Sequence, residues 1–286
     1  MKVLVIGGNG YLGRAYCETL TSLGHDSVVF DLPSDVRNIR EEEIAELSPG
    51  LVVNFSMIAN LKQPQISHNE IDFQTNVEGL KRIIDSVSPN KIPLVQISTR
   101  EVIGLRDFRR DFGSPFISSD DLRRVGENEP CFPLHSYGKT KLIAEYLCQG
   151  YERGSVVRLN TPYSDDWMSG KGLISVLVKK SVIDAKVRLD NDGRAVRDPL
   201  HISDLTTLIF KVIEKGCFQQ VINAGGGEQN VVSLLEICQG ANAKVQIESG
   251  QQNGDFGFLF DISKASELGW LPKVDIRKWL GAIKNH

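Results

Sequence analysis

The sequence predicts an α/β fold in which a parallel sheet carries helices on both faces. Two observations predict it. A continuous apolar run, Val3–Ile6, leads directly into glycines spaced GxxGxxG and then into a helical pattern. Strand-like apolar runs and helical patterns then alternate from residue 1 to about 160. Such alternation is typical of a doubly wound parallel sheet.

Each expected element rests on its periodicity. Short continuous apolar runs indicate strands buried on both faces, whereas spacings of three and four indicate amphipathic helices. We expect strands near 2–6, 27–31, 51–55, 93–98 and 154–159, and helices near 11–23, 40–47, 69–88 and 136–150. After Asn160 the pattern loosens.

Composition narrows the function classes. The 286 residues allow one large α/β domain or a domain with a small cap, and the net charge of −3 shows no footprint for nucleic acid. The five cysteines are scattered without metal-ligand spacing, so we expect reduced thiols and no metal site. The apolar run at Leu4–Ile6 is too short for a signal peptide, and no stretch suits a membrane span. We therefore expect a cytoplasmic protein without a membrane partner.

The glycine run predicts a dinucleotide site. Gly7, Gly10 and Gly13 permit a tight turn and a close approach of the backbone, and the following helix offers unpaired N–H groups to a pyrophosphate. The second expected strand ends in Asp31, 18 residues after Gly13. A carboxylate there accepts the ribose hydroxyls and repels a 2′-phosphate, which favours NAD over NADP.

Tyr137 and Lys141 are candidates for acid/base chemistry. They lie four residues apart, hence on one face of the expected helix 136–150. A lysine ammonium beside a phenol favours the phenolate, and we expect it to lower the pKa of Tyr137 towards neutrality. Tyr137 would then suit proton transfer.

Together these motifs resemble the extended short-chain dehydrogenase/reductase family, and within it the NAD-dependent nucleotide-sugar epimerases and dehydratases. Further segments match motifs of that family in the same order along the chain: Val52–Ser56, Asn76–Gly79, Ile97–Gly104, Val157–Tyr163, Val196–Leu205, Asn223–Gly227 and Asp261–Trp270. The resemblance implies a Rossmann-type domain at 1–160, to which 193–225 returns. It also implies a smaller substrate-binding lobe at 161–192 and 226–286.

The resemblance also implies roles for single residues. Thr99 would bind the sugar hydroxyl, Tyr137 would remove its proton, and Lys141 would hold the nicotinamide ribose and the phenolate. Glu101 would be a further catalytic group. The cofactor would contact Gly7, Asn9, Gly10, Tyr11, Leu12, Gly13, Asp31, Asp35, Val36, Phe55, Ser56, Met57, Asn76 and Lys141. The substrate would contact Arg100, Asn160, Thr161 and Arg197.

Three features bear on the exact activity. Glu101 fits the base position of the 4,6-dehydratases, but Arg100 does not fit their general acid. The link from Asp31 to Val52 is short, which is similar to 4-keto-sugar reductases of the same superfamily. The long segment Leu105–Pro133 is either a surface excursion or a flap over the sugar.

We therefore expect an NAD-dependent epimerase or dehydratase that acts on a nucleotide-activated sugar through a 4-keto intermediate. An NAD(P)H-dependent 4-keto-sugar reductase is the first alternative. A non-catalytic NAD(P)-sensing regulatory protein is the second. By resemblance, the expected helices 69–88 and 136–150 would form the interface of a homodimer.

Overall fold

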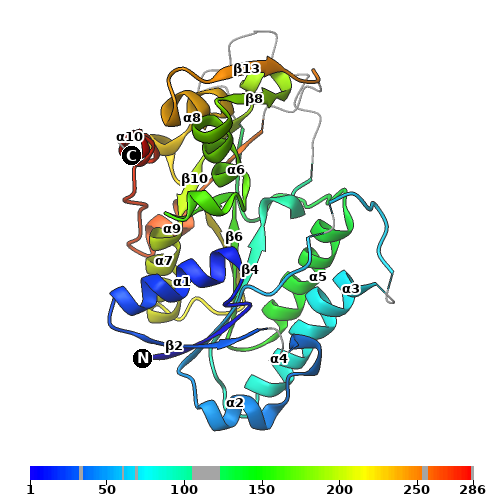
Figure 1. Ribbon diagram of the computed structural model, residues 1–286. Helices are drawn as coiled ribbons and strands as arrows, with labels where there is room; N and C mark the ends of the chain where they lie inside the picture. The colour runs from blue at the N-terminus through cyan, green and yellow to red at the C-terminus, as the bar shows by residue number, and fades with distance from the viewer. Residues whose placement is uncertain (32–34, 60, 68–69, 105–122, 253–256, 285–286) are drawn as a thin grey trace.

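The computed structural model describes residues 1–31, 35–59, 61–67, 70–104, 123–252 and 257–284. Its centre is a parallel sheet of six strands in the order β11-β6-β4-β3-β1-β2 (Figure 1). The strands are β1 (Lys2–Ile6), β2 (Asp26–Phe30), β3 (Leu51–Asn54), β4 (Leu94–Thr99), β6 (Gly154–Leu159) and β11 (Gln220–Ala224). The predicted doubly wound α/β fold is confirmed.

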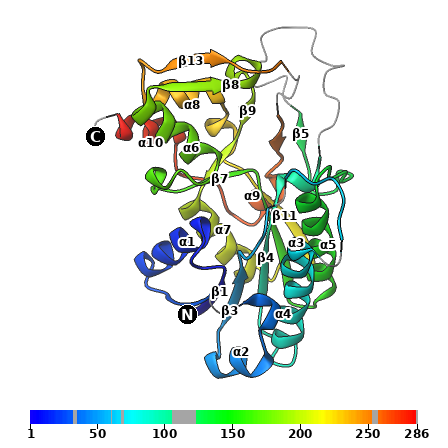
Figure 2. The same cartoon turned by 45° about the vertical axis from the view of Figure 1, so that its right-hand side comes forward.

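Successive residues of β1 show how the sheet is covered on both faces. Val3 and Val5 pack into one apolar cluster with α1 (Tyr11–Ser22) and α7 (Ile202–Glu214). Leu4 and Ile6 pack into a second cluster with α2 (Glu41–Leu47), α4 (Gly79–Val87) and α5 (Ser136–Gly150). Side chains alternate across a strand, so a continuous apolar run serves both layers. Figure 2 shows the two helix layers on either side of the sheet.

The helix expected at 69–88 has three parts. A short α3 (Ile71–Phe73) runs into a π-helical turn (Gln74–Glu78), and α4 follows at Gly79. The wide turn carries Asn76, whose side chain bonds the backbone of Ile58 and the hydroxyl of Thr140. The single regular helix expected from periodicity is thus wrong in its middle, because apolar spacing alone does not distinguish a π-turn from an α-turn.

A third apolar cluster lies away from the sheet. It is formed by α6 (Leu173–Lys179), α8 (Leu234–Ala241) and α10 (Ile276–Ile283), together with the parallel pair β8 (Lys186–Leu189) and β13 (Gln246–Ser249). Figure 1 shows these elements gathered at the top of the molecule. The pairs β7 (Thr161–Tyr163) with β10 (Pro199–His201), β9 (Val196–Arg197) with β12 (Val232–Ser233), and β5 (Arg124–Val125) with β14 (Leu259–Phe260) complete the strands.

The remaining short elements include α9 (Ser263–Glu267), whose Ala265 packs with Trp270 into the cluster of α7. Short 3-10 turns occupy Val36–Asn38, Arg100–Val102, Trp167–Ser169, Asp190–Gly193 and Glu228–Asn230, and a π-turn occupies Lys180–Asp184. In the parts of the chain that the structure describes, none of the helices has the length and apolar character needed to cross a bilayer.

Candidate functional site

A cavity of about 960 Å³ opens at the carboxyl ends of the central strands. This is where ligands bind in doubly wound sheets, because the chain leaves β1 in one direction and β3 in the other. Most of the residues predicted for the site line this cavity: Gly7, Gly10, Tyr11, Leu12, Gly13, Asp31, Asp35, Val36, Phe55, Ser56, Met57, Thr99, Arg100, Glu101, Tyr137, Asn160, Thr161 and Arg197. Asn9, Asn76 and Lys141 are not among the residues that line it.

The glycine turn between β1 and α1 has no room for side chains. Gly7 has a φ of +78°, and a Cβ there would lie 2.6 Å from the backbone nitrogen of Ser56. A Cβ on Gly13 would overlap the carbonyl oxygen of Gly7. The helix begins at Tyr11 with Gly10 as its N-cap, which offers no side-chain cap. The first N–H groups of α1 are thus available to an anion, and the turn fits the pyrophosphate of NAD.

Two carboxylates, those of Asp31 and Asp35, line the cavity near the glycine turn. Asp31 directly follows β2, and its Oδ2 accepts a hydrogen bond of 2.8 Å from the backbone nitrogen of Asn9. Asp35 pairs with Arg37, and these hydrogen bonds hold the pKa of Asp35 below its usual range. The Arg37 side chain lines the same part of the cavity. Because Arg37 is paired, its charge does not cancel the repulsion that Asp31 would exert on a 2′-phosphate.

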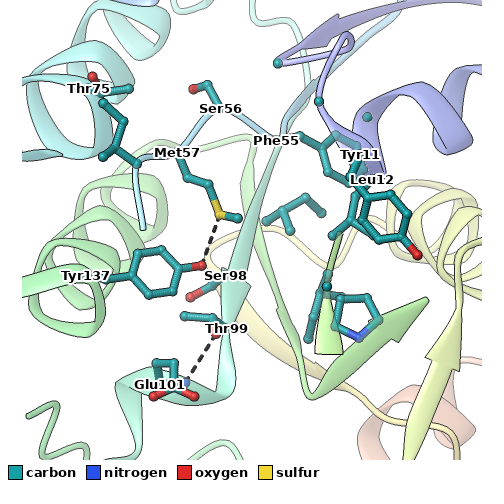
Figure 3. A pocket seen from close by; sticks show the side chains of 18 of the residues that line it. Tyr11, Leu12, Phe55, Ser56, Met57, Thr75, Ser98, Thr99, Glu101 and Tyr137 are labelled. Atoms are coloured by element: carbon teal, nitrogen blue, oxygen red, sulfur yellow. Dashed lines mark hydrogen bonds between the residues drawn. The ribbon is translucent and has the colours of Figure 1, made fainter. Parts of the chain in front are cut away.

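Tyr137 lies at the start of α5 and is nearly buried, with 7% of its surface exposed. Figure 3 shows its hydroxyl between Met57 and Thr99. The hydroxyl donates to the Met57 sulfur at 3.1 Å. Burial raises the pKa of Tyr137, and the hydrogen bond with Thr99 opposes this only in part. The predicted lowering of this pKa is therefore wrong for the protein by itself, because desolvation of the phenol outweighs its polar neighbours.

Lys141 follows one helical turn later and has an exposure of only 2%. Burial lowers the pKa of Lys141 to about 8, and the Glu145 carboxylate, a further turn along α5, opposes this. At this pKa most Lys141 side chains are still protonated near neutral pH, so the buried ammonium remains available as a positive charge on the face of α5 that carries Tyr137.

Thr99 and Glu101 sit where β4 ends. The Thr99 Oγ1 accepts a hydrogen bond of 3.3 Å from the backbone nitrogen of Glu101 and so caps the turn at Arg100–Val102. Thr99 and Glu101 are both partly exposed and line the cavity. The structure thus brings Thr99, Glu101 and Tyr137 together, as the sequence predicts (Figure 3).

Polar side chains from separate segments meet at the other end of the cavity. Arg100 donates to the Asn160 Oδ1 at 3.1 Å, and its guanidinium lies 4.2 Å from the centre of the Phe258 ring. The hydroxyl of Thr161 donates to the same Asn160 oxygen at 3.1 Å. The Asn160 amide donates to the Phe258 carbonyl at 3.3 Å.

Arg197 enters this region from β9. It donates to the Val196 carbonyl at 2.7 Å, and its guanidinium lies against Gly257. The next residue, Asp198, is buried, and burial raises the pKa of its carboxyl to about 7. His201 accepts a hydrogen bond from the backbone of Ser203 and caps α7, which is a structural role.

Several lining residues escaped the sequence analysis. They share no motif with the predicted residues and include Arg37, Ile71, Thr75, His135, Lys171, Gly172 and Phe258. Arg37 could have been found from its position beside Asp35 and Val36. Phe258 has no local signal, because it meets Arg100 only through the tertiary fold.

Two further expectations concern other parts of the chain. Residues 105–122 of the long segment lie outside the described residues, whereas 123–133 include β5, paired with β14. Over the described ranges, no group of three or more His, Cys, Asp or Glu side chains could hold a metal ion.

Comparisons with known proteins agree with this geometry. A putative UDP-glucose 4-epimerase of Methanocaldococcus jannaschii is 20% identical over 99% of this chain and 97% of its own. The solved structure of dTDP-glucose 4,6-dehydratase from Bacillus anthracis in complex with NAD has a TM-score of 0.79 and 23% identity, covering 100% of this chain and 96% of its own. A dTDP-4-dehydrorhamnose reductase from Clostridium acetobutylicum has a TM-score of 0.77 and 18% identity, covering 100% and 99%.

At these identities the structural likenesses establish the fold alone. The family model of the NAD dependent epimerase/dehydratase family, however, matches residues 3–225, which include the glycine turn, Thr99, Tyr137 and Arg197. In accord with the resemblance to extended short-chain dehydrogenases/reductases, the chain therefore belongs to the NAD dependent epimerase/dehydratase family, and its cofactor is NAD.

Proposed function

We propose that this protein is an NAD-dependent epimerase or dehydratase that acts on a nucleotide-activated sugar through a 4-keto intermediate. One observation carries the proposal. Tyr137 and Thr99 meet in the same cavity as the glycine turn, so an acid/base group and a dinucleotide site face one space. The family match and the relatives named for UDP-glucose and dTDP-glucose support this class of substrate.

The side chains would divide the first step between them. Thr99 would bind the hydroxyl at C4 of the sugar, and Tyr137 would accept its proton. NAD, when bound, supplies the oxidant that takes the hydrogen from C4. Burial raises the pKa of Tyr137, so proton transfer needs a positive charge nearby. Lys141, one turn along α5, is the candidate for that charge and for the ribose contact.

Glu101 favours chemistry beyond plain epimerisation. It lines the cavity beside Thr99, at the end of the same strand. A carboxylate here could act on the carbons next to the new ketone, as a dehydratase requires. We therefore rank dehydration beside epimerisation. Dehydration would make the protein a lyase, and epimerisation would make it an isomerase.

The wider assignments follow from the same cavity. We propose that 1–160 with 193–225 binds NAD and that 161–192 with 226–286 contributes the substrate lobe. The sugar nucleotide would contact Arg100, Asn160, Thr161 and Arg197, which line one end of the cavity. We also propose that the protein acts in the cytoplasm as a homodimer through the helical segments 69–88 and 136–150.

A 4-keto-sugar reductase is the second candidate. The reductase structure with a TM-score of 0.77 and the short link after Asp31 favour it. Asp31 opposes the use of NADPH. Titrating the apoprotein with NAD and NADP by calorimetry separates the two, because tighter binding of NADP would favour the reductase. A purely NAD-sensing protein would not need Thr99, Tyr137 and Lys141 together.

The proposal is tested on the purified protein. Mass and ultraviolet analysis should find bound NAD(H). A screen of UDP-, dTDP-, GDP- and CDP-sugars should then show conversion of one sugar without added reductant. Absence of both cofactor and conversion would contradict the proposed function.

A further inference from the structure

Tyr11 joins the glycine turn to the proposed substrate lobe. It is the first residue of α1, where unpaired backbone N–H groups face the site of the pyrophosphate. Its side chain lines the cavity on the side opposite Tyr137 (Figure 3). The phenol hydroxyl shares a hydrogen bond of 2.7 Å with the Ser175 Oγ, and it accepts another of 3.1 Å from the backbone nitrogen of Ser164.

Both partners of this hydroxyl belong to the other lobe. Ser175 lies in α6, Ser164 directly follows β7, and both residues are almost fully buried. If the Tyr11 hydroxyl were removed, each partner would lose a hydrogen bond in surroundings shielded from bulk water, and such a loss is costly. The hydroxyl therefore helps to hold α6 beside the cavity.

The segment between these two serines shapes the cavity. Lys171, Gly172 and Leu173 are among the lining residues, and a Cβ on Gly172 would lie 3.2 Å from the Tyr11 ring. Before them lies a 3-10 turn at Trp167–Ser169, none of whose residues is buried. A segment with so little buried surface has low stability of its own. Its position at the cavity therefore depends on the elements to which it is bonded.

A second contact between α1 and this segment lies at the surface. Arg14, one turn after Tyr11, forms an ion pair with Asp166 at 2.5 Å. The two side chains are 54% and 38% exposed, and an ion pair in such a place contributes little because water screens it. We expect the Tyr11 hydroxyl to be the stronger link, and Arg14 offers a matched control.

A link of this kind couples two ligands. NAD, when bound at the N–H groups of the glycine turn, fixes the first turn of α1 and with it the Tyr11 side chain. The fixed hydroxyl then holds the segment 164–175 in place, so that less conformational entropy is lost when a ligand binds against it.

We propose that Tyr11 is a positioning residue through which NAD at the glycine turn and the sugar nucleotide in the other lobe strengthen each other's binding. Such an effect is reciprocal, because the coupling free energy is the same for both ligands. The identity of the second ligand rests on the proposed function, whereas the link between NAD and the segment 164–175 does not.

Amide hydrogen exchange measures this link without any substrate. The full chain is compared free of cofactor and saturated with NAD, by mass spectrometry of peptides that cover 164–179. The wild type, Tyr11→Phe, Ser175→Ala and the double variant are measured. Tyr11→Phe removes the hydroxyl and keeps the ring. Arg14→Gln breaks the exposed ion pair on the same helix and is the control.

NAD should slow the exchange of this segment in the wild type by roughly 5- to 150-fold, the usual range of coupling between two sites. Tyr11→Phe and Ser175→Ala should each abolish most of this protection. The double variant should be no worse than either single variant, because both substitutions remove the same hydrogen bond. Arg14→Gln should keep the protection. Unchanged exchange on addition of NAD to the wild type, or equal protection in Tyr11→Phe, would overturn the inference and leave the proposed function standing.

Steady-state kinetics at saturating NAD test the second ligand. For the sugar nucleotide that the wild type converts, Tyr11→Phe should raise KM by up to the same factor and lower kcat far less, because the groups around Tyr137 are untouched. An unchanged KM would overturn the coupling to the sugar nucleotide. If NAD protected the segment through Tyr11 but no sugar nucleotide bound, the proposed function would fall, and this coupling with it.

Discussion

The two ends of the cavity are built differently. At the cofactor end, Gly7 lies in the turn after β1 and Gly13 in the first turn of α1, and neighbouring backbone leaves no room for a Cβ on either residue. At the substrate end, side chains of Arg100, Asn160 and Arg197 come from distant segments and are held by hydrogen bonds and ring contacts. The first end depends on the absence of side chains and the second on their presence.

This difference predicts different responses to substitution. A Cβ on Gly7 would press against the backbone at Ser56, and backbone cannot rotate away as a side chain can. A lost side chain at the substrate end removes one interaction of about 1–3 kcal/mol and leaves its neighbours in place. Changes at the cofactor end should therefore affect every ligand, whereas changes at the substrate end should be selective.

Tyr137 stands between the two ends, and its substitution should have the largest effect. Tyr137→Phe should lower kcat by roughly 10²–10⁴-fold, because a positioned acid/base group is lost. KM and NAD affinity should change little, since the ring and its packing remain. Steady-state kinetics with calorimetry check both. Tyr146→Phe, on the same helix but 68% exposed, is the control and should keep full activity. Full activity of Tyr137→Phe would contradict the assignment of the base.

Gly13→Ala should be the next largest change. Its Cβ would overlap the Gly7 carbonyl, and relief requires the turn to move. If the displaced turn has to return to its place for NAD to bind, a cost of about 1–3 kcal/mol corresponds to roughly 5- to 150-fold weaker binding. Gly281→Ala, where a Cβ would meet open space within α10, is the matched control. Unchanged NAD affinity in Gly13→Ala would mean that the cofactor does not use this turn.

Arg197→Ala tests the selectivity of the substrate end. If Arg197 binds the diphosphate, KM for the nucleotide sugar should rise roughly 10- to 100-fold, with NAD affinity almost unchanged. Arg197→Lys should recover part of the loss, because an ammonium does not reproduce the planar fork. An unchanged KM would make Arg197 a structural residue. A loss of NAD affinity would remove the distinction between the two ends.

The contrast between the two ends also explains which features could be predicted from the sequence. The glycine turn and Asp31 are local patterns, and they predicted the fold and NAD as cofactor, both of which are confirmed. The sixth strand, β11, was expected only as a return of 193–225, because Gln220–Ala224 is too short to distinguish from other apolar runs. The periodicity of apolar residues does not predict the π-turn at Gln74–Glu78.

At the site, the sequence predicts which residues line the cavity better than it predicts the surroundings of each side chain. Most of the predicted residues line the cavity, although their roles stay predictions. The raised pKa of Tyr137 was missed because it depends on burial by distant segments rather than on the neighbouring Lys141. The stacking of Phe258 on Arg100 joins residues far apart in the chain, and no local pattern marks it.

The smallest effect is expected at Asp198, whose titration shows whether the charges at the substrate end act separately. Its carboxyl is 1% exposed behind the substrate end, and burial raises its pKa from 3.8 to about 7. The native state then binds this proton more tightly than the unfolded state does. The stability that Asp198 contributes is therefore fully present below about pH 3.8 and is lost as the pH rises through about 7.

Asp198→Asn removes this titration. Relative to the wild type, the variant should gain about 1–3 kcal/mol on going from pH 5 to pH 8, because the wild type loses about 1.4 kcal/mol per pH unit until the pH reaches the folded pKa of about 7. At roughly 2–4 °C per kcal/mol, thermal unfolding followed at both pH values can resolve the gain. Asp26→Asn, at an exposed position of β2, is the control and should show no such gain. A constant difference between Asp198→Asn and the wild type would mean that Asp198 stays ionised throughout. Arg100 and Arg197, whose charges oppose the rise in its pKa, would then hold the carboxylate, and the substrate end would be an ionic network rather than a set of separable contacts.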